Sequence, residues 1–113
     1  MLVPRNKQIW LYNEPVDMRK CINGLSILIA ESFKKKAALN SMFVFYNKNK
    51  NIVKTLYWHY DAFCLLCKKS NKNTFKVPAA MINNILLSKH QFIKLLEGLH
   101  FSNDYENKYD IFY

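Results

Sequence analysis

Two cysteines three residues apart, Cys64 and Cys67, form the spacing in this sequence that is most typical of a metal site or a redox pair. A structural zinc ion would need two further ligands. The residues that could supply them are Cys21, His59, His90 and His100. The pair falls in a predicted strand, where positions three apart point to opposite faces, and no helix N-terminus lies nearby to activate a thiol. We therefore expect free thiols, with no metal and no cofactor.

The carboxylates do not form a recognisable catalytic set. Two-metal DNA strand transfer needs carboxylates that are brought together around paired metal ions. Here Asp17 is suited to capping a helix, Asp61 to a turn, and Glu31 and Glu97 to solvated helix positions. The sequence also has no glycine-rich phosphate loop and no serine-centred elbow. We predict that the chain is not an enzyme by itself.

Lysines carry the clearest functional signal. The segment from residue 34 to residue 76 contains ten lysines and one acid, so it accounts for the whole formal net charge of +9. Such a cluster attracts nucleic acid by releasing condensed counterions, although an AT-rich genome that encodes surfaces in lysine and asparagine would give the same composition. The candidate nucleic-acid-binding residues are Arg19, Lys20, Lys48, Lys50, Lys54, Lys68, Lys69 and Lys72.

The elements that position these residues begin with a strand at residues 7–12, which ends at the breaker around Pro15. A long helix follows, with Asp17 as its N-cap and apolar residues at spacings of three and four as far as Phe33. The three lysines that follow, Lys34 to Lys36, would close this helix at the end where cations suit the helix dipole.

The middle of the chain has the period of strands. Residues 42–46, 52–59, 63–68 and 74–77 predict an antiparallel four-stranded meander. Because successive turns of a meander alternate between its ends, the turns at 47–51 and 69–73 should share one end. This geometry predicts a single basic edge. Its members are Lys48, Lys50, Lys68, Lys69 and Lys72.

The C-terminal part begins with residues 79–87, an apolar stretch that suits either a helix or a strand. Ser88 and Gln91 then have the spacing of a capping box, which predicts a short helix that ends near Gly98. The expected fold is α+β: an N-terminal strand and long helix, an antiparallel four-stranded meander, and a short C-terminal helix. We expect one domain over residues 1–101 and a C-terminal tail over residues 102–113.

The composition supports a small protein of the cytoplasm. Half of the residues are hydrophobic, which is enough for one packed core in 113 residues. We find no signal-peptide pattern and no apolar run that could span a bilayer, so no membrane association is expected. The odd number of cysteines fits a reducing compartment.

Several short fragments occur in a specific order and spacing, although each alone is weak. They are Ile9-Trp10, Asp17-Met18-Arg19-Lys20, Gly24-Leu25, Phe43-Val44-Phe45, Ile52-Val53-Lys54, Leu56-Tyr57-Trp58, Leu65, Lys68-Lys69, Phe75, Pro78 and Leu95-Leu96-Glu97-Gly98. In this order the chain, from about Ile9 to Phe101, resembles the accessory protein of insertion-sequence-66 type transposons. That protein is commonly called TnpB or the second open-reading-frame product.

The resemblance implies a helper in DNA transposition that works beside a separate transposase. Our leading hypothesis is a non-catalytic accessory factor that binds the DNA ends of the element, or the transposase–DNA complex, through the lysine-rich edge. Arg19 and Lys20 would add a second contact. The alternative is a protein-interaction module that binds the transposase without touching DNA. The sequence leaves the DNA strand preference open, and it leaves open whether the protein is a homodimer.

Overall fold

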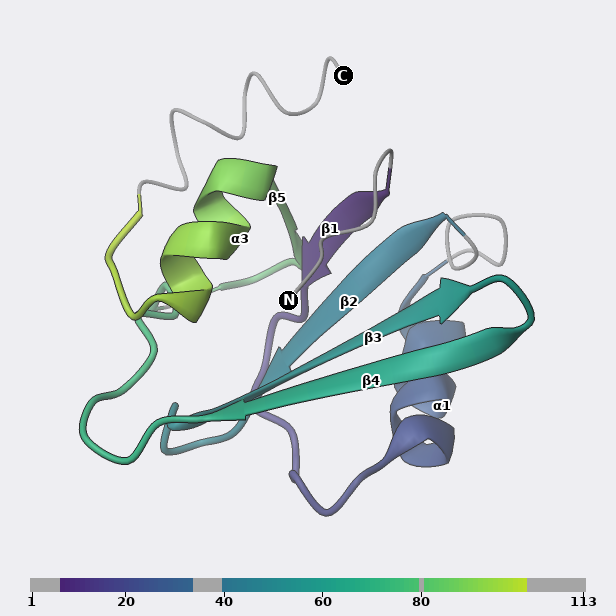
Figure 1. Cartoon of the computed structure of the whole chain (residues 1–113), viewed down its shortest axis with the longest axis horizontal. Coiled ribbons are helices and arrows are strands. Elements are labelled where there is room, and N and C mark those ends of the chain that lie inside the picture. Colours follow the sequence, from purple (N-terminus) through teal and green to yellow (C-terminus); the bar gives the residue numbers. More distant parts are fainter. Residues whose placement is uncertain (1–6, 34–39, 80, 102–113) are drawn as a thin grey trace.

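The computed structural model describes residues 7–33, 40–79 and 81–101. In these residues a five-stranded mixed sheet, in the order β4-β3-β2-β1-β5, carries helix α1 on one face and helix α3 on the other (Figure 1). The elements are β1 (Gln8–Leu11), α1 (Ile22–Ser32), β2 (Ser41–Tyr46), β3 (Ile52–His59), β4 (Ala62–Lys69), β5 (Ile85–Leu87) and α3 (Lys89–Leu96).

The sheet combines a meander with a parallel crossover. Strands β2, β3 and β4 pair antiparallel, whereas β1 runs parallel to β2, with Ile9 opposite Met42. A parallel pair needs a long connection, and the segment that contains α1 provides it. Strand β5 completes the sheet by pairing antiparallel with β1.

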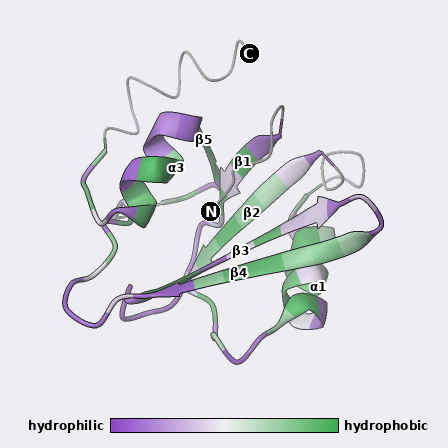
Figure 2. Ribbon diagram, in the orientation of Figure 1, coloured by the Kyte–Doolittle hydropathy of each residue, from purple (hydrophilic) through white to green (hydrophobic). Residues whose placement is uncertain are grey.

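The core consists of two apolar layers that share the sheet. On one face, Met42 and Val44 of β2 pack with Phe92 and Leu95 of α3. On the other face, β2 contributes residues to a cluster with α1. That cluster includes Leu25, Ile29, Phe43, Phe45 and Leu56. Because both faces of β2 are covered, all six of its residues are buried, and the hydropathy colouring shows the apolar middle of the sheet (Figure 2).

Several predicted elements are confirmed. The expected strand at 7–12 is β1, the strands at 42–46 and 52–59 are β2 and β3, and the strand at 63–68 is β4. The capping box is also present: the Ser88 hydroxyl accepts from the Gln91 amide at 3.0 Å, and the Gln91 side-chain oxygen accepts from the Ser88 amide at 2.8 Å. Helix α3 ends just before Gly98, whose φ of 77° suits glycine.

The prediction of a fourth strand in the meander is wrong. Residues 74–77 form no strand; instead the Phe75 amide donates to the Lys50 carbonyl, and the side chains of Phe75 and Val77 enter the core under α3. The chain thus crosses below the sheet and adds β5 beside β1, at the edge remote from β4. A local apolar period could not distinguish burial under a helix from pairing at the sheet edge.

The predicted N-terminus of the first helix is also wrong. Helix α1 begins at Ile22, with Cys21 in the N-cap position, so the helix is shorter than expected. Asp17 does not cap it. Its carboxylate accepts from the amide and side chain of Arg19, and its carbonyl accepts from the Lys20 amide, which closes a separate turn before the helix. The predicted closing lysines, at residues 34–36, lie outside the described residues, as does the predicted tail.

None of the described helices is long and apolar enough to cross a membrane.

Candidate nucleic-acid interface

The two lysine-rich turns lie at the same end of the sheet, as predicted, and are joined by backbone hydrogen bonds. Ile52, at the start of β3, pairs with Lys69, at the end of β4. Beyond that pair the Ser70 amide donates to the Asn51 carbonyl at 2.8 Å, and the Phe75 amide donates to the Lys50 carbonyl at 2.6 Å. The two turns therefore form one continuous surface, which we call the basic end.

Asn47 shapes the first turn. Its side-chain oxygen accepts from the amides of Asn51 and Ile52, both at 3.0 Å, and its side-chain nitrogen donates to the Asn51 side chain at 2.6 Å. Lys50 adopts a left-handed backbone conformation, with φ at 57°. These bonds fix the turn without using a lysine side chain, so Lys48 remains exposed at its tip.

The second turn presents its lysines in a similar way. The Asn73 amide donates to the Ser70 hydroxyl at 3.1 Å, while Lys69 and Lys72 are exposed. Within the described residues, the ammonium groups of Lys48, Lys69 and Lys72 make no hydrogen bond or ion pair. Their charges are therefore available to an external anion.

Arg19 and Lys20 are exposed close to the basic end. The preceding chain is anchored there because the Val16 amide donates to the carbonyl of Tyr46, the last residue of β2, at 2.8 Å. The guanidinium of Arg19 pairs with Asp17 at 2.6 Å, with 91% of its side chain exposed. Hydrogen bonds from Arg19 lower the pKa of Asp17 to about 2, and the same contact raises the pKa of Arg19.

Lys54 is placed differently from the other candidate residues. It is only 8% exposed, and its ammonium group donates to the carbonyls of Met18 at 2.7 Å and Lys20 at 2.9 Å. It thereby holds the turn before α1 against β3 and presents little of its charge to solvent. In the pairing of β2 with β3, Lys54 lies opposite the buried Phe45, a placement that the sequence alone does not reveal.

Lys68 also bonds to the protein. Its ammonium group donates to the carbonyl of Leu96, the last residue of α3, and so links this helix to β4. The orphan carbonyls of a helix C-terminus favour a cation. Lys68 is otherwise exposed, so its ammonium group bonds to α3 and also faces solvent.

The basic end also includes two acids. The carboxylate of Asp17 is paired with Arg19. Glu14 lies near Tyr46: burial, and after it the charge of Glu14, raises the pKa of the Tyr46 hydroxyl to about 12. The positive charge is therefore concentrated on the two turns rather than spread uniformly over this end.

Sequence reasoning missed two residues beside the first turn, one lysine and one histidine. Lys76 and His100 line the same hollow of about 460 Å³ as Lys50, together with apolar residues such as Phe75 and Phe101. No acid lines this hollow. Lys76 belongs to the charged segment and could have been found from it, whereas only the packing of the chain after α3 brings His100 there.

The two cysteines of the metal-like spacing do not converge. Cys64 pairs with Tyr57 and Cys67 with Lys54, on opposite faces of β4, and both are free thiols. Among the described residues, no three histidine, cysteine or acidic side chains gather closely enough to hold a metal ion.

Comparisons with known proteins assign the chain to a family. Residues 7–106 match the family model described as IS66 Orf2-like protein. Two uncharacterised proteins of Sinorhizobium fredii are similar: y4hO is 24% identical over 90% of this chain and 89% of its own length, and y4jC is 26% identical over 84% and 81%. No solved structure matches. The chain therefore belongs to the IS66 Orf2-like family, which associates it with an accessory role in the transposition of an insertion sequence.

Proposed function

We propose that this protein is a non-catalytic accessory factor that binds DNA during transposition, and that the basic end is its contact surface. The supporting observation is the pair of hydrogen-bonded turns, which exposes Lys48, Lys69 and Lys72 without internal partners. Lys50 extends the same surface, and Arg19 and Lys20 flank it. The partners are the DNA ends of the element and the separate transposase.

The shape of the basic end favours contact with the DNA backbone. Turns that are fixed by their own backbone bonds present lysine side chains as mobile point charges, which suit phosphate groups. No described helix carries these lysines into a groove, so base readout has no support from them. We therefore expect binding that depends weakly on DNA sequence, with the selection of element ends left to the transposase.

The experiment is a binding assay that compares the terminal-repeat duplex of the element with an unrelated duplex. Lys48→Gln with Lys72→Gln should weaken binding to both duplexes. Lys89→Gln with Lys94→Gln, which removes the same charge from α3, is the matched control and should leave affinity nearly unchanged. Equal losses in the two variants would show that only net charge matters and would reject the basic end as the site.

The alternative, binding to the transposase without DNA contact, rests on other surfaces. The tail lies outside the described residues, and the apolar stretch at 79–87 contributes Ile85–Leu87 to the sheet as β5. The large apolar side chain that is exposed in the described part of this stretch is that of Ile82, at 86%. A complex with the transposase that survives nuclease treatment and Lys48→Gln with Lys72→Gln, but is lost in Ile82→Ser, would favour this alternative.

A further inference from the structure

The two edges of the sheet differ greatly in length. Strand β5 forms one edge with only three residues, Ile85–Leu87. Strand β4 forms the other edge with eight residues, and each of them pairs with β3, so the outer side of β4 has no strand partner among the described residues (Figure 1). A long edge of this kind offers a row of unpaired backbone groups to another strand.

Strand β4 is apolar but poorly covered. Its first six residues are Ala-Phe-Cys-Leu-Leu-Cys, yet none is buried, and Phe63 is 38% exposed. Helix α1 lies close to β4, and its Leu25 and Ile29 belong to the apolar cluster that includes Leu65, but it leaves Phe63 and the outer side of the strand open. An apolar edge strand that remains open in a monomer is a site for pairing with another chain.

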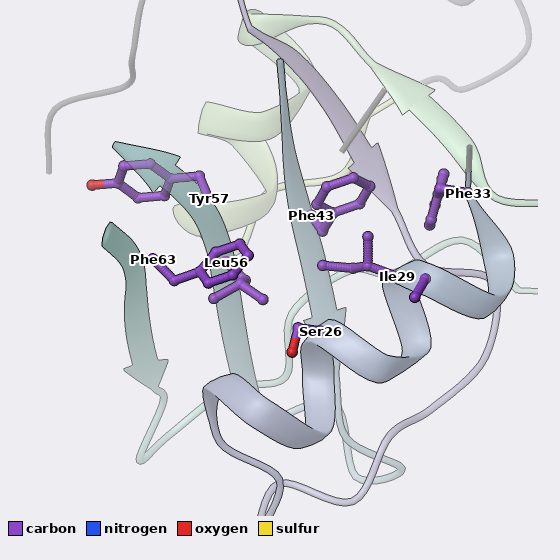
Figure 3. A pocket seen from close by; sticks show the side chains of 8 residues that line it. Ser26, Ile29, Phe33, Phe43, Leu56, Tyr57 and Phe63 are labelled. Atoms are coloured by element: carbon purple, nitrogen blue, oxygen red, sulfur yellow. The ribbon is translucent and has the colours of Figure 1, made fainter. Parts of the chain in front are cut away.

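An apolar hollow lies beside the first half of this strand. It has a volume of about 360 Å³ between α1 and the sheet, with Phe63 at its β4 side and Ser26 and Ile29 on α1 (Figure 3). A second, more open hollow lies near the start of α1 and is lined by Leu65 and Gly24 together with the cations Arg19 and Lys20. The α1 side of β4 is therefore hollowed near both Phe63 and Leu65.

The charges along β4 indicate which strand could pair with its open edge. Asp61 stands immediately before the strand, and Lys68 and Lys69 end it. Two copies of β4 placed antiparallel would bring the acid of each beside the lysines of the other, whereas a parallel arrangement would place like charges together. The strand is thus complementary to itself in charge as well as in hydrophobicity.

We propose that β4 pairs with β4 of a second copy of this chain, antiparallel and centred on Leu65, to form one continuous sheet across a two-fold axis. Residues that face each other in such a pair lie on the same side of the sheet. Leu65 therefore meets Leu65 of the second copy, Phe63 meets Cys67, and Asp61 meets Lys69. The Leu65 pair lies on the two-fold axis and occurs once, and each of the other two contacts occurs twice, as an isologous interface requires.

One consequence rests on the proposed DNA binding. Because the strands are antiparallel, the basic ends of the two copies lie at opposite ends of the shared sheet. Lys48, Lys50 and Lys72 stay outside the contact, since they belong to the turns and not to β4, whereas Lys69 ends β4 and faces Asp61 of the second copy, so the DNA contact of the dimer rests on the turn lysines. The dimer would hold two separate DNA segments, one for each copy, as a complex of two element ends requires.

The first test measures the mass of the protein in solution without DNA, by light scattering after gel filtration. The wild type should be a dimer, and Leu65→Lys a folded monomer. Ile27→Lys, which places the same charge on an exposed apolar residue of α1, should remain a dimer. A wild type that is monomeric at every concentration would overturn the proposal.

A charge exchange keeps the test informative even if Leu65→Lys fails to fold. Asp61→Lys alone and Lys69→Asp alone should each weaken the dimer, and the two together should restore it. Failure of the double variant to recover would reject this register, since residues that merely stabilise the fold would not rescue each other across the axis.

Cross-linking tests the centre of the contact directly. In a chain with Cys21, Cys64 and Cys67 all changed to serine, Leu65→Cys should form a disulfide-linked dimer on mild oxidation. Ser32→Cys, exposed at the end of α1, should not. A monomer that still binds DNA would refute only the pairing of β4, and a dimer without DNA binding would refute only the proposed function.

Discussion

Lys48 and Lys54 are six residues apart in the sequence, but they lie in two regions with different chemistry. Lys48 is exposed in a turn whose hydrogen bonds come from Asn47, whereas Lys54 is buried in β3 and bonds to two carbonyls. Lys68, on β4, resembles Lys54 because its ammonium group also bonds to a carbonyl.

The difference shows that a basic segment does not by itself define a binding surface. A lysine on a strand that faces a neighbouring element meets unpaired carbonyls there, and its charge is used to satisfy them. A lysine in a turn that is already closed by asparagine meets solvent. The orientation of each lysine, rather than the total charge, therefore decides which of them can bind phosphate.

Among these lysines, Lys54→Met is expected to lower the free energy of unfolding most. This change leaves the carbonyls of Met18 and Lys20 without their donor in a partly buried place. Denaturation with urea should show a loss of about 1–3 kcal/mol in the free energy of unfolding. Lys48→Met serves as the control and should stay within about 0.5 kcal/mol of the wild type. If both variants lost the same stability, the contrast between strand and turn lysines would fail.

A smaller effect is expected from Lys68→Met. Its bond to the Leu96 carbonyl links α3 to β4, but the lysine is exposed, so water can replace it at the helix C-terminus. Unfolding in urea should lose about 0.5–1.5 kcal/mol, less than in Lys54→Met. A loss larger than that of Lys54→Met would mean that the packing of α3, and not burial, sets the importance of these lysines.

The smallest effect on stability is expected from the ion pair of Arg19 and Asp17. Because the folded-state pKa of Asp17 is lowered to about 2, the pair contributes stability above the unfolded pKa near 3.8, and this contribution disappears as the pH falls toward 2. Both side chains are exposed, so the contribution is small.

The carboxyl titration can be followed by NMR. Its midpoint should lie near 2 in the wild type and return toward 3.8 in Arg19→Gln. Asp17→Asn should also release Arg19 from its ion pair and raise DNA affinity slightly. Arg19 would then be able to bind phosphate as the turn lysines do. An unchanged affinity would place Arg19 outside the DNA contact.

Much of the sheet could be predicted from the sequence because its signals are local. The β-branched and aromatic residues between Ile52 and His59, the turn residues after Tyr46 and the capping box at Ser88 each favour one local conformation. The placement of both lysine turns at one end followed from counting strands alone. These inferences need no knowledge of distant contacts.

What could not be predicted depended on contacts between remote segments. The parallel pairing of β1 with β2 and the path of Phe75 beneath the sheet are each set by residues far away in the sequence. Lys54 is the clearest case, because its partners lie at positions 18 and 20. In the sequence it looks like any other lysine of the charged segment.

The most direct test of DNA binding by the turn lysines is the salt dependence of DNA affinity in Lys48→Gln with Lys72→Gln. With about five phosphate contacts, the wild type should show a slope near −4.5 for log affinity against log salt, at about 0.9 per contact. The double variant should be shallower by about 1.8 for two lost contacts, while Lys89→Gln with Lys94→Gln should keep the wild-type slope. Equal slopes in all three proteins, or affinity independent of salt, would contradict a DNA contact made by the turn lysines.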